Sequence, residues 1–275
     1  EPTLAEPLVS LTLKANQSCG RTEAGDLYCW GDLSEYGAGS TARYATKIEE
    51  NAPGATSAGS CQLHPEGHVS CQGFNAYGEL AQGDAVVQWG NQPSTVLLPE
   101  VKASDLAGDT NYSMCIIDAD ASPGQVHCWR TSLNGHHDKL ANGTSDPIPL
   151  PDRMPVLGDD DLPIEASELE AGVGYSIYPF FGAILTNGDV VTWGTDGSTS
   201  YPMAGHNGNS TRARRVIREA DQTPLGEASA LSLGYYAACA VIGDSQEVWC
   251  WGGSGSTDVV DVNLGVKSYA QPIPT

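Results

Sequence analysis

Apolar and polar residues alternate over short stretches of this chain. Residues 8–13, Leu-Val-Ser-Leu-Thr-Leu, show the pattern near the N-terminus, and residues 259–262 and 266–269 have comparable strand character near the other end. A two-residue period places successive side chains on opposite faces of a β-strand. Short strands joined by Gly-, Ser-, Asn- and Asp-rich connections are therefore expected along the chain.

A short unit recurs five times: small or polar residues, Cys, a turn containing Gly, a few strand residues, and then Cys-Trp-Gly. The copies occupy residues 18–31, 60–73, 114–130, 183–194 and 238–252. Gln72 replaces the Trp of the second copy, and Arg130 replaces the Gly of the third. The Trp position recurs at intervals of 42, 57, 64 and 58 residues, which is typical of β-propeller blades.

The cysteines within each copy are 10, 10, 13 and 11 residues apart, and each pair spans a turn. Two antiparallel strands joined by such a turn bring their Cα atoms within disulfide range. The fourth copy lacks both cysteines together, with Ala183 and Thr192 expected in their places, as one shared bond would require. We therefore predict four hairpin disulfides: Cys19 with Cys29, Cys61 with Cys71, Cys115 with Cys128, and Cys239 with Cys250.

These features predict an all-β fold, a β-propeller of about five four-stranded blades in one domain that covers 1–275. The approximate repeat units are 8–53, 54–103, 104–165, 166–226 and 227–275. A sandwich or an open solenoid is the alternative. The Trp side chains are expected to pack between blades; they are Trp30, Trp129, Trp193 and Trp251. We also expect a terminal strand to pair within the blade that holds the other terminus and so to close the ring.

The motif resembles the repeats of the regulator of chromosome condensation family. Residues 19–31, 183–194 and 239–252 carry this resemblance best. It implies a β-propeller, and secreted bacterial members of that family are similar in having paired cysteines on the same two strands. The founding member is a seven-bladed nuclear exchange factor, so its nucleotide exchange and histone binding are not expected of this acidic, cysteine-paired chain.

Charge and cysteine content narrow the function. The chain has 34 acidic and 13 basic residues, a formal net charge of -21, which disfavours nucleic acid and anionic lipid as partners. This charge favours solubility, with binding of cations or basic partners as the alternative. No stretch reaches the roughly 20 apolar residues that span a bilayer. Persistent disulfides indicate an oxidising compartment and hence a secreted or cell-surface protein. No Cys-x2-Cys pair favours zinc, and no metal or cofactor is predicted.

Three polar clusters are candidate sites. His136-His137-Asp138 and Asp159-Asp160-Asp161 could contribute metal ligands, but both lack suitable spacing and are interpreted as solvated loops. Four arginines within seven positions are either a loop that balances nearby acids or a candidate contact with a partner or another copy; they are Arg212, Arg214, Arg215 and Arg218. Sequons at Asn16, Asn111, Asn142 and Asn209 are compatible with glycosylation.

No catalytic residue is singled out, and the chain is predicted not to be an enzyme. The first hypothesis is a secreted binding module for a protein or glycan, because rigid propellers commonly place function on loops. The second is a structural subunit of an extracellular assembly such as a filament, possible partners including copies of the chain itself. The third is a polysaccharide-acting enzyme with carboxylates at the central channel.

Non-reducing peptide mapping of the native protein is expected to find the four hairpin pairs and no cross-repeat pair. Each bond closes a loop of roughly ten residues, so the chain-entropy model assigns it about 2.5–3 kcal/mol. A single disulfide between two repeats would contradict the assignment.

Overall fold

The computed structural model describes these residues: 7–13, 17–22, 26–32, 41–49, 56–58, 61–64, 66–73, 94–108, 113–120, 122–130, 140–143, 154–173, 179–194, 205, 211–234, 237–252 and 267–272. All regular elements among them are strands, apart from a 3-10 residue at Leu140. No described helix is long and apolar enough to cross a bilayer.

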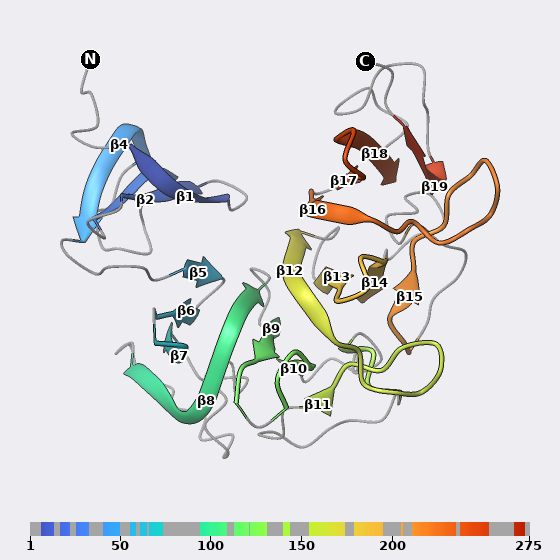
Figure 1. The fold of residues 1–275 in the computed structure, drawn as a ribbon. Helices are drawn as coiled ribbons and strands as arrows, with labels where there is room; N and C mark the ends of the chain where they lie inside the picture. Colours follow the sequence, from blue (N-terminus) through green and yellow to red (C-terminus); the bar gives the residue numbers. More distant parts are fainter. Residues whose placement is uncertain are drawn as a thin grey trace.

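The strands pair in chain order and form five four-stranded units (Figure 1). Unit 1 contains β1 (Leu8–Leu13), β2 (Gln17–Thr22), β3 (Leu27–Asp32) and β4 (Thr41–Glu49). Unit 2 contains β5 (Thr56–Ala58), β6 (Cys61–Leu63), β7 (His68–Gly73) and the first part of β8 (Ser94–Gly108). Unit 3 contains the rest of β8, β9 (Ser113–Asp118), β10 (Val126–Arg130) and β11 (Met154–Pro155).

Unit 4 contains β12 (Ala166–Val173), β13 (Pro179–Leu185), β14 (Val190–Gly194) and β15 (Arg214–Arg215). Unit 5 contains β16 (Ala228–Leu233), β17 (Ala237–Ile242), β18 (Glu247–Gly252) and β19 (Lys267–Pro272). The 15-residue β8 joins units 2 and 3 into one seven-stranded sheet, because it pairs with β7 through Lys102 and with β9 from Ala103. The predicted all-β, propeller-type architecture is confirmed.

Glycine at two places in the repeat has a backbone reason. The Gly after Trp has a positive φ in units 1, 4 and 5, at Gly31 (94°), Gly194 (98°) and Gly252 (84°). The glycines of the hairpin turns are also left-handed, for example Gly188 (85°). Residues with a Cβ rarely adopt this conformation, so the backbone explains why both positions of the motif are glycine.

Disulfides close the hairpins. The Cys115–Cys128 and Cys239–Cys250 bonds are present, each between residues directly opposite one another, which confirms these two predicted pairs. Cys29 and Cys61 are also disulfide-bonded, and the register places them opposite Cys19 and Cys71. Among the described residues no cysteine is free.

The register corrects the alignment of the fourth copy. Thr192 occupies the second cysteine position as expected, but Gly182, not Ala183, lies opposite it. A Cβ at Gly182 would approach Leu231 and Leu233 of unit 5 to 3.1 Å. Side chains of the next unit therefore fill the space that a disulfide occupies elsewhere.

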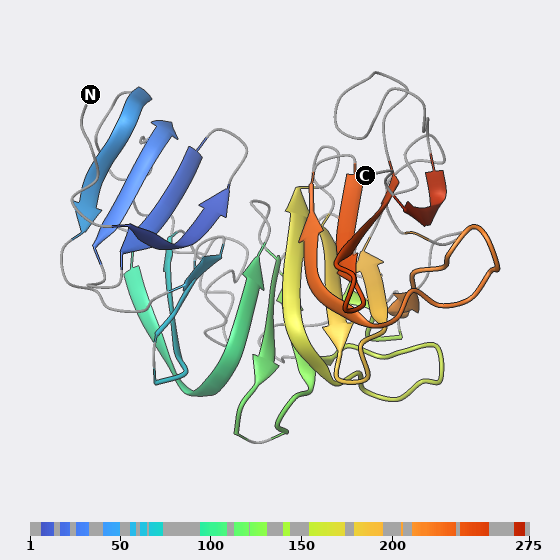
Figure 2. The ribbon, with the colours of Figure 1, turned by 45° about the horizontal axis from the view of Figure 1, so that its top comes forward.

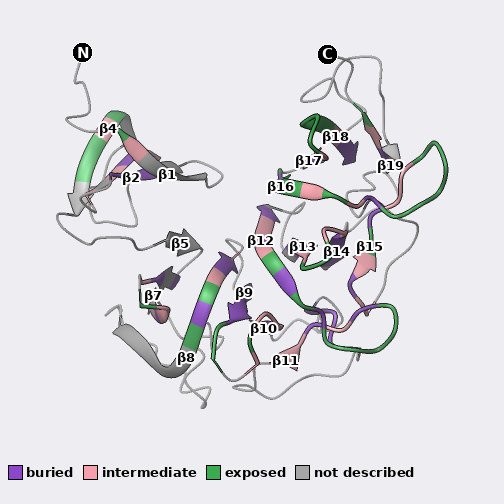
Figure 3. Ribbon diagram, viewed as in Figure 1, coloured by how far each residue is buried: buried purple, intermediate pink, exposed green. Residues whose placement is uncertain are grey.

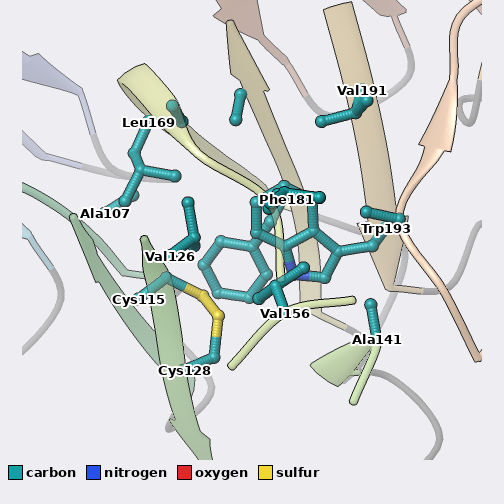
Figure 4. Close-up of a cluster of buried hydrophobic side chains, with 14 of the residues drawn as sticks. Ala107, Cys115, Val126, Cys128, Ala141, Val156, Leu169, Phe181, Val191 and Trp193 are labelled. Carbon is teal, nitrogen blue, oxygen red and sulfur yellow. A yellow bond between two sulfur atoms is a disulfide. The ribbon is translucent and has the colours of Figure 1, made fainter. Parts of the chain in front are cut away.

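Each unit has two faces, named here by their contents. The tryptophan face carries the Trp of the motif, and the disulfide face carries the residues at the two cysteine positions, because neighbouring residues of a strand point to opposite sides. Trp193 of unit 4 lies among residues of the unit 3 disulfide face and stacks on Phe181, with ring centroids 5.8 Å apart (Figure 4). The main core therefore lies between units.

The same junction occurs on either side of this one. Trp129 of unit 3 packs with Cys61, Leu63 and Val69 of unit 2. Trp251 of unit 5 packs with Phe180, Ile184 and Val190 of unit 4. Trp129, Trp193 and Trp251 are only 1–2% exposed, whereas Trp30 in unit 1 is half-buried. In each described junction, the tryptophan face covers the disulfide face of the preceding unit.

The expectation that the terminal strands close the ring is wrong for the described residues. β1 pairs with β2, and β19 pairs with β18, so each terminal strand stays within its own unit. The units follow one another around an arc, with units 1 and 5 at its two ends (Figures 1 and 2). Each sheet thus forms its backbone hydrogen bonds between consecutive strands, and neighbouring units are joined mainly by packing of their faces.

Trp193→Ala is expected to lower the free energy of unfolding by about 3–5 kcal/mol, because it empties a fully packed junction. Trp30→Ala, the same change on the half-buried ring of unit 1, is expected to cost less than half as much. Chemical denaturation in dilute solution measures both values. Equal losses would show that burial between units does not govern the stability of these sheets.

Candidate functional site

The first strands of units 3, 4 and 5 lie side by side along the inside of the arc; they are the end of β8, β12 and β16 (Figures 1 and 2). Each has a register shift at the same place, between Ala103 and Asp105, Ala166 and Glu168, and Ala228 and Ala230. Asp105 and Glu168 therefore hold equivalent positions. With Glu170 they form what we call the carboxylate row.

Two carboxylates of the row connect neighbouring units. Asp105 accepts a hydrogen bond from the Leu169 backbone N–H of unit 4 (2.8 Å), and its other oxygen accepts one from Leu106 (2.8 Å). Glu168 accepts a hydrogen bond from the Leu231 backbone N–H of unit 5 (2.9 Å). The row thus supplies acceptors for backbone donors on the next inner strand, and these bonds repeat from one junction to the next.

Burial shapes the protonation of the row. Burial raises the pKa of Asp105 and of Glu168, although their backbone hydrogen bonds oppose the shift. Burial, together with the charges of Glu168 and Asp105, raises the pKa of Glu170 to about 7. Glu170 is therefore partly protonated at neutral pH, which limits repulsion among three neighbouring acids. Among the described residues, no group of three His, Cys, Asp or Glu side chains could hold a metal ion.

The sequence contained a signal for this row that the cysteine motif obscured. Ser104-Asp105-Leu106 and Ser167-Glu168-Leu169 are two copies of one pattern, and Ser229-Ala230-Leu231 is a third without the acid. The cysteine motif covers only the second and third strands of each unit. The inner strand has its own repeat, and the acids would have emerged from it.

The arginine cluster and the acidic triad, which the sequence presents as separate features, meet in the structure. Arg212 pairs with Asp161, and Arg214 lies 3.3 Å from Asp159. These contacts link the β11–β12 connection to the segment that enters β15. They match the interpretation of a loop that balances nearby acids.

The other two arginines also have contacts within the chain. Arg215 donates to Asp189 at 2.9 Å, and Arg218 lies over the Trp249 ring, 5.2 Å from its centroid, within the range of a cation–π interaction. All four arginines therefore have contacts within the chain. Their role in contacting a partner stays a prediction.

Of the four sequons and the His-His-Asp cluster at 136–138, only Asn142 lies among the described residues. Asn142 is buried, and its side-chain Nδ2 lies 3.6 Å from the Met154 sulfur, so the folded chain leaves no room for a glycan at this sequon. Asn16, Asn111 and Asn209, together with 136–138, lie outside the described residues.

Comparison with known proteins supports the fold. No protein-family model matches the chain, and no curated protein matches it in sequence. Among solved structures, human WBSCR16 superposes with a TM-score of 0.63 at 16% identity, over 89% of this chain and 60% of that one. Prp20p of Saccharomyces cerevisiae, the yeast RCC1, superposes with a TM-score of 0.57 at 15% identity, over 94% and 58%.

A third solved structure, the ectodomain of the Arabidopsis thaliana receptor kinase ACR4, has a TM-score of 0.50 at 16% identity, over 100% of this chain and 72% of that one. The chain spans less than two thirds of WBSCR16 and of Prp20p. Prp20p is described by its binding to Gsp1p and histones. The fold is thus that of an RCC1-like β-propeller, as the resemblance of the repeat motif implied.

Glu170→Gln is expected to stabilise the protein relative to the native chain as the pH rises. The pKa of Glu170 is raised from its ordinary 4.5 to about 7 in the folded state, so the folded native chain binds more protons than the unfolded one between these values, and its stability falls as the pH rises through them. The neutral amide does not titrate. Chemical denaturation at pH 5 and pH 8 measures the free energy of unfolding of both proteins, and Glu165→Gln, at an exposed position, is the control. If Glu170→Gln changed this free energy equally at both pH values, the raised pKa of Glu170 would be contradicted.

Proposed function

We propose that the protein is an extracellular, non-catalytic propeller module that binds a basic protein partner through the connections between its units. The observation that carries the binding role is the similarity of its fold to Prp20p, which binds Gsp1p and histones. The similarity to an ectodomain and the two hairpin disulfides support the extracellular setting.

The β11–β12 connection is suited to such contact. Its residues 156–164 fold back on themselves through the Leu157–Pro163 bridge, and the ion pairs of Asp159 and Asp161 hold it in place. Leu162 at its tip is 62% exposed, beside exposed acids. A rigid loop that presents one apolar side chain among carboxylates favours a basic partner, because the net charge of -21 steers positive surfaces towards it.

The carboxylate row supports a non-catalytic role. Both oxygens of Asp105 and one of Glu168 accept backbone hydrogen bonds, so these acids already have a structural task. Turnover of any polysaccharide by the native protein, lost in Glu170→Gln, would instead support the glycan-acting enzyme.

The binding proposal is tested with the purified chain immobilised and exposed to the extracellular proteins of its source. We expect a basic protein to be retained and to elute as salt rises. The double variant Asp160→Lys/Leu162→Ala should lose it, whereas Asp244→Lys, the same charge change on the exposed hairpin turn of unit 5, should keep it. Equal loss in both variants, or retention of glycans alone, would contradict a specific protein site at this loop.

A further inference from the structure

The two ends of the arc carry the two halves of the internal junction. Between units 3 and 4, the disulfide face of unit 3 is fully covered: Cys115, Ile117 and Val126 are 0–2% exposed beneath the tryptophan face of unit 4. The described junctions on either side follow the same rule. A disulfide face is thus a surface built to receive a tryptophan face.

Unit 5 presents such a surface that is only partly covered: Cys250 is 3% exposed, but Cys239 and Val241 are half-buried. The register places Cys239, Val241 and Val248 where unit 3 has Cys115, Ile117 and Val126. Val248 is 39% exposed, while Val126 is 0% exposed. The second strands of the two units show the same contrast, because every residue of β9 is buried whereas β17 is half-buried at Cys239 and Val241. Figure 3 also shows exposed positions on β16, the inner strand of unit 5. The apolar positions of the junction are kept in unit 5, although no described unit covers them.

Unit 1 presents the complementary surface. Trp30 lies opposite Ser18 on β2, as Trp193 lies opposite Phe181 on β13. It is half-buried, whereas Trp129, Trp193 and Trp251 are 1–2% exposed. No described unit covers this face either. The arc thus ends in an acceptor face at unit 5 and a donor face at unit 1.

We propose that the disulfide face of unit 5 binds the tryptophan face of unit 1 of a second copy of this chain. The proposal goes beyond the partner binding proposed above and does not rest on it. We choose a second copy as the partner because the internal junctions show that a tryptophan face fits a disulfide face. Unit 1 of a second copy offers such a tryptophan face. The contact joins two different faces, so it is head-to-tail, and each added copy leaves both kinds of face open.

Two features set the strength of this junction. Ala230 stands where Asp105 and Glu168 stand in the internal junctions, so the bond from a carboxylate to the next inner strand is missing. Each copy also carries a net charge of -21, and like charges repel at low salt. The association is therefore reversible and strengthens as salt screens the repulsion.

Sedimentation of the full chain over a range of concentrations tests the proposal. We expect a series of oligomers that lengthens with concentration and with salt. Val248→Glu and Trp30→Ala should each raise the dissociation constant about tenfold or more, since one places a charge in an apolar contact and the other removes its largest side chain. Leu162→Glu, the same kind of change at an exposed site away from both faces, should leave association unchanged.

Mixing the two variants separates head-to-tail from like-to-like contact. Each variant keeps one intact face, so the mixture should form dimers and nothing longer. A photo-crosslinker at position 248 should join β3 of another copy and give a product of dimer mass. A chain that stays monomeric at every concentration, a crosslink to β3 within one chain, or a crosslink between two copies of position 248 would each overturn the proposal. Binding of the basic partner depends on Leu162 and not on Val248, so the two proposals fail independently.

Discussion

The fold depends on one contact, the packing of a tryptophan face onto the disulfide face of the preceding unit. A four-stranded sheet of this size buries little apolar surface alone, and the largest fully buried side chains, Trp129 and Trp251, lie at such contacts. Local hairpins define each sheet, but the core exists only between sheets. The stability of every unit is therefore shared with its neighbours, as in other repeat proteins.

The carboxylate row shows what the inner strands require in addition. Backbone N–H groups there donate to carboxylates of the preceding unit. A buried donor left without a partner would cost about 1–3 kcal/mol. Among the described residues no backbone N–H donates to the Glu170 carboxylate. Its pKa, about 7, is raised by burial and by the charges of Glu168 and Asp105, with no hydrogen bond to oppose the shift. Asp105 and Glu168 therefore hold adjacent inner strands together.

Much of the fold could be predicted from the sequence because the repeat encodes local geometry. Paired cysteines, turn glycines and the Trp-Gly step each constrain a hairpin, so strands and disulfides could be inferred from spacing. The contacts between units could not, since they join residues that no motif relates: the Arg212–Asp161 pair spans 51 residues, and Asp105 meets Leu169 across 64. The wrong assignment of Ala183 to the first cysteine position has the same cause. Gly182 occupies that position because Leu231 and Leu233 of the next unit leave little space for a side chain, and no local sequence rule predicts this contact.

The position of the disulfides has a mechanical consequence. Cys115–Cys128 and Cys239–Cys250 each lie within one hairpin, and neither joins two units. A force that pulls the two termini apart would therefore act first on the non-covalent junctions between units, while each covalent bond keeps its hairpin segment from extending. The chain would lengthen in steps as units separate, and every clipped hairpin would keep its strand pairing and be ready to pack again when the load is released.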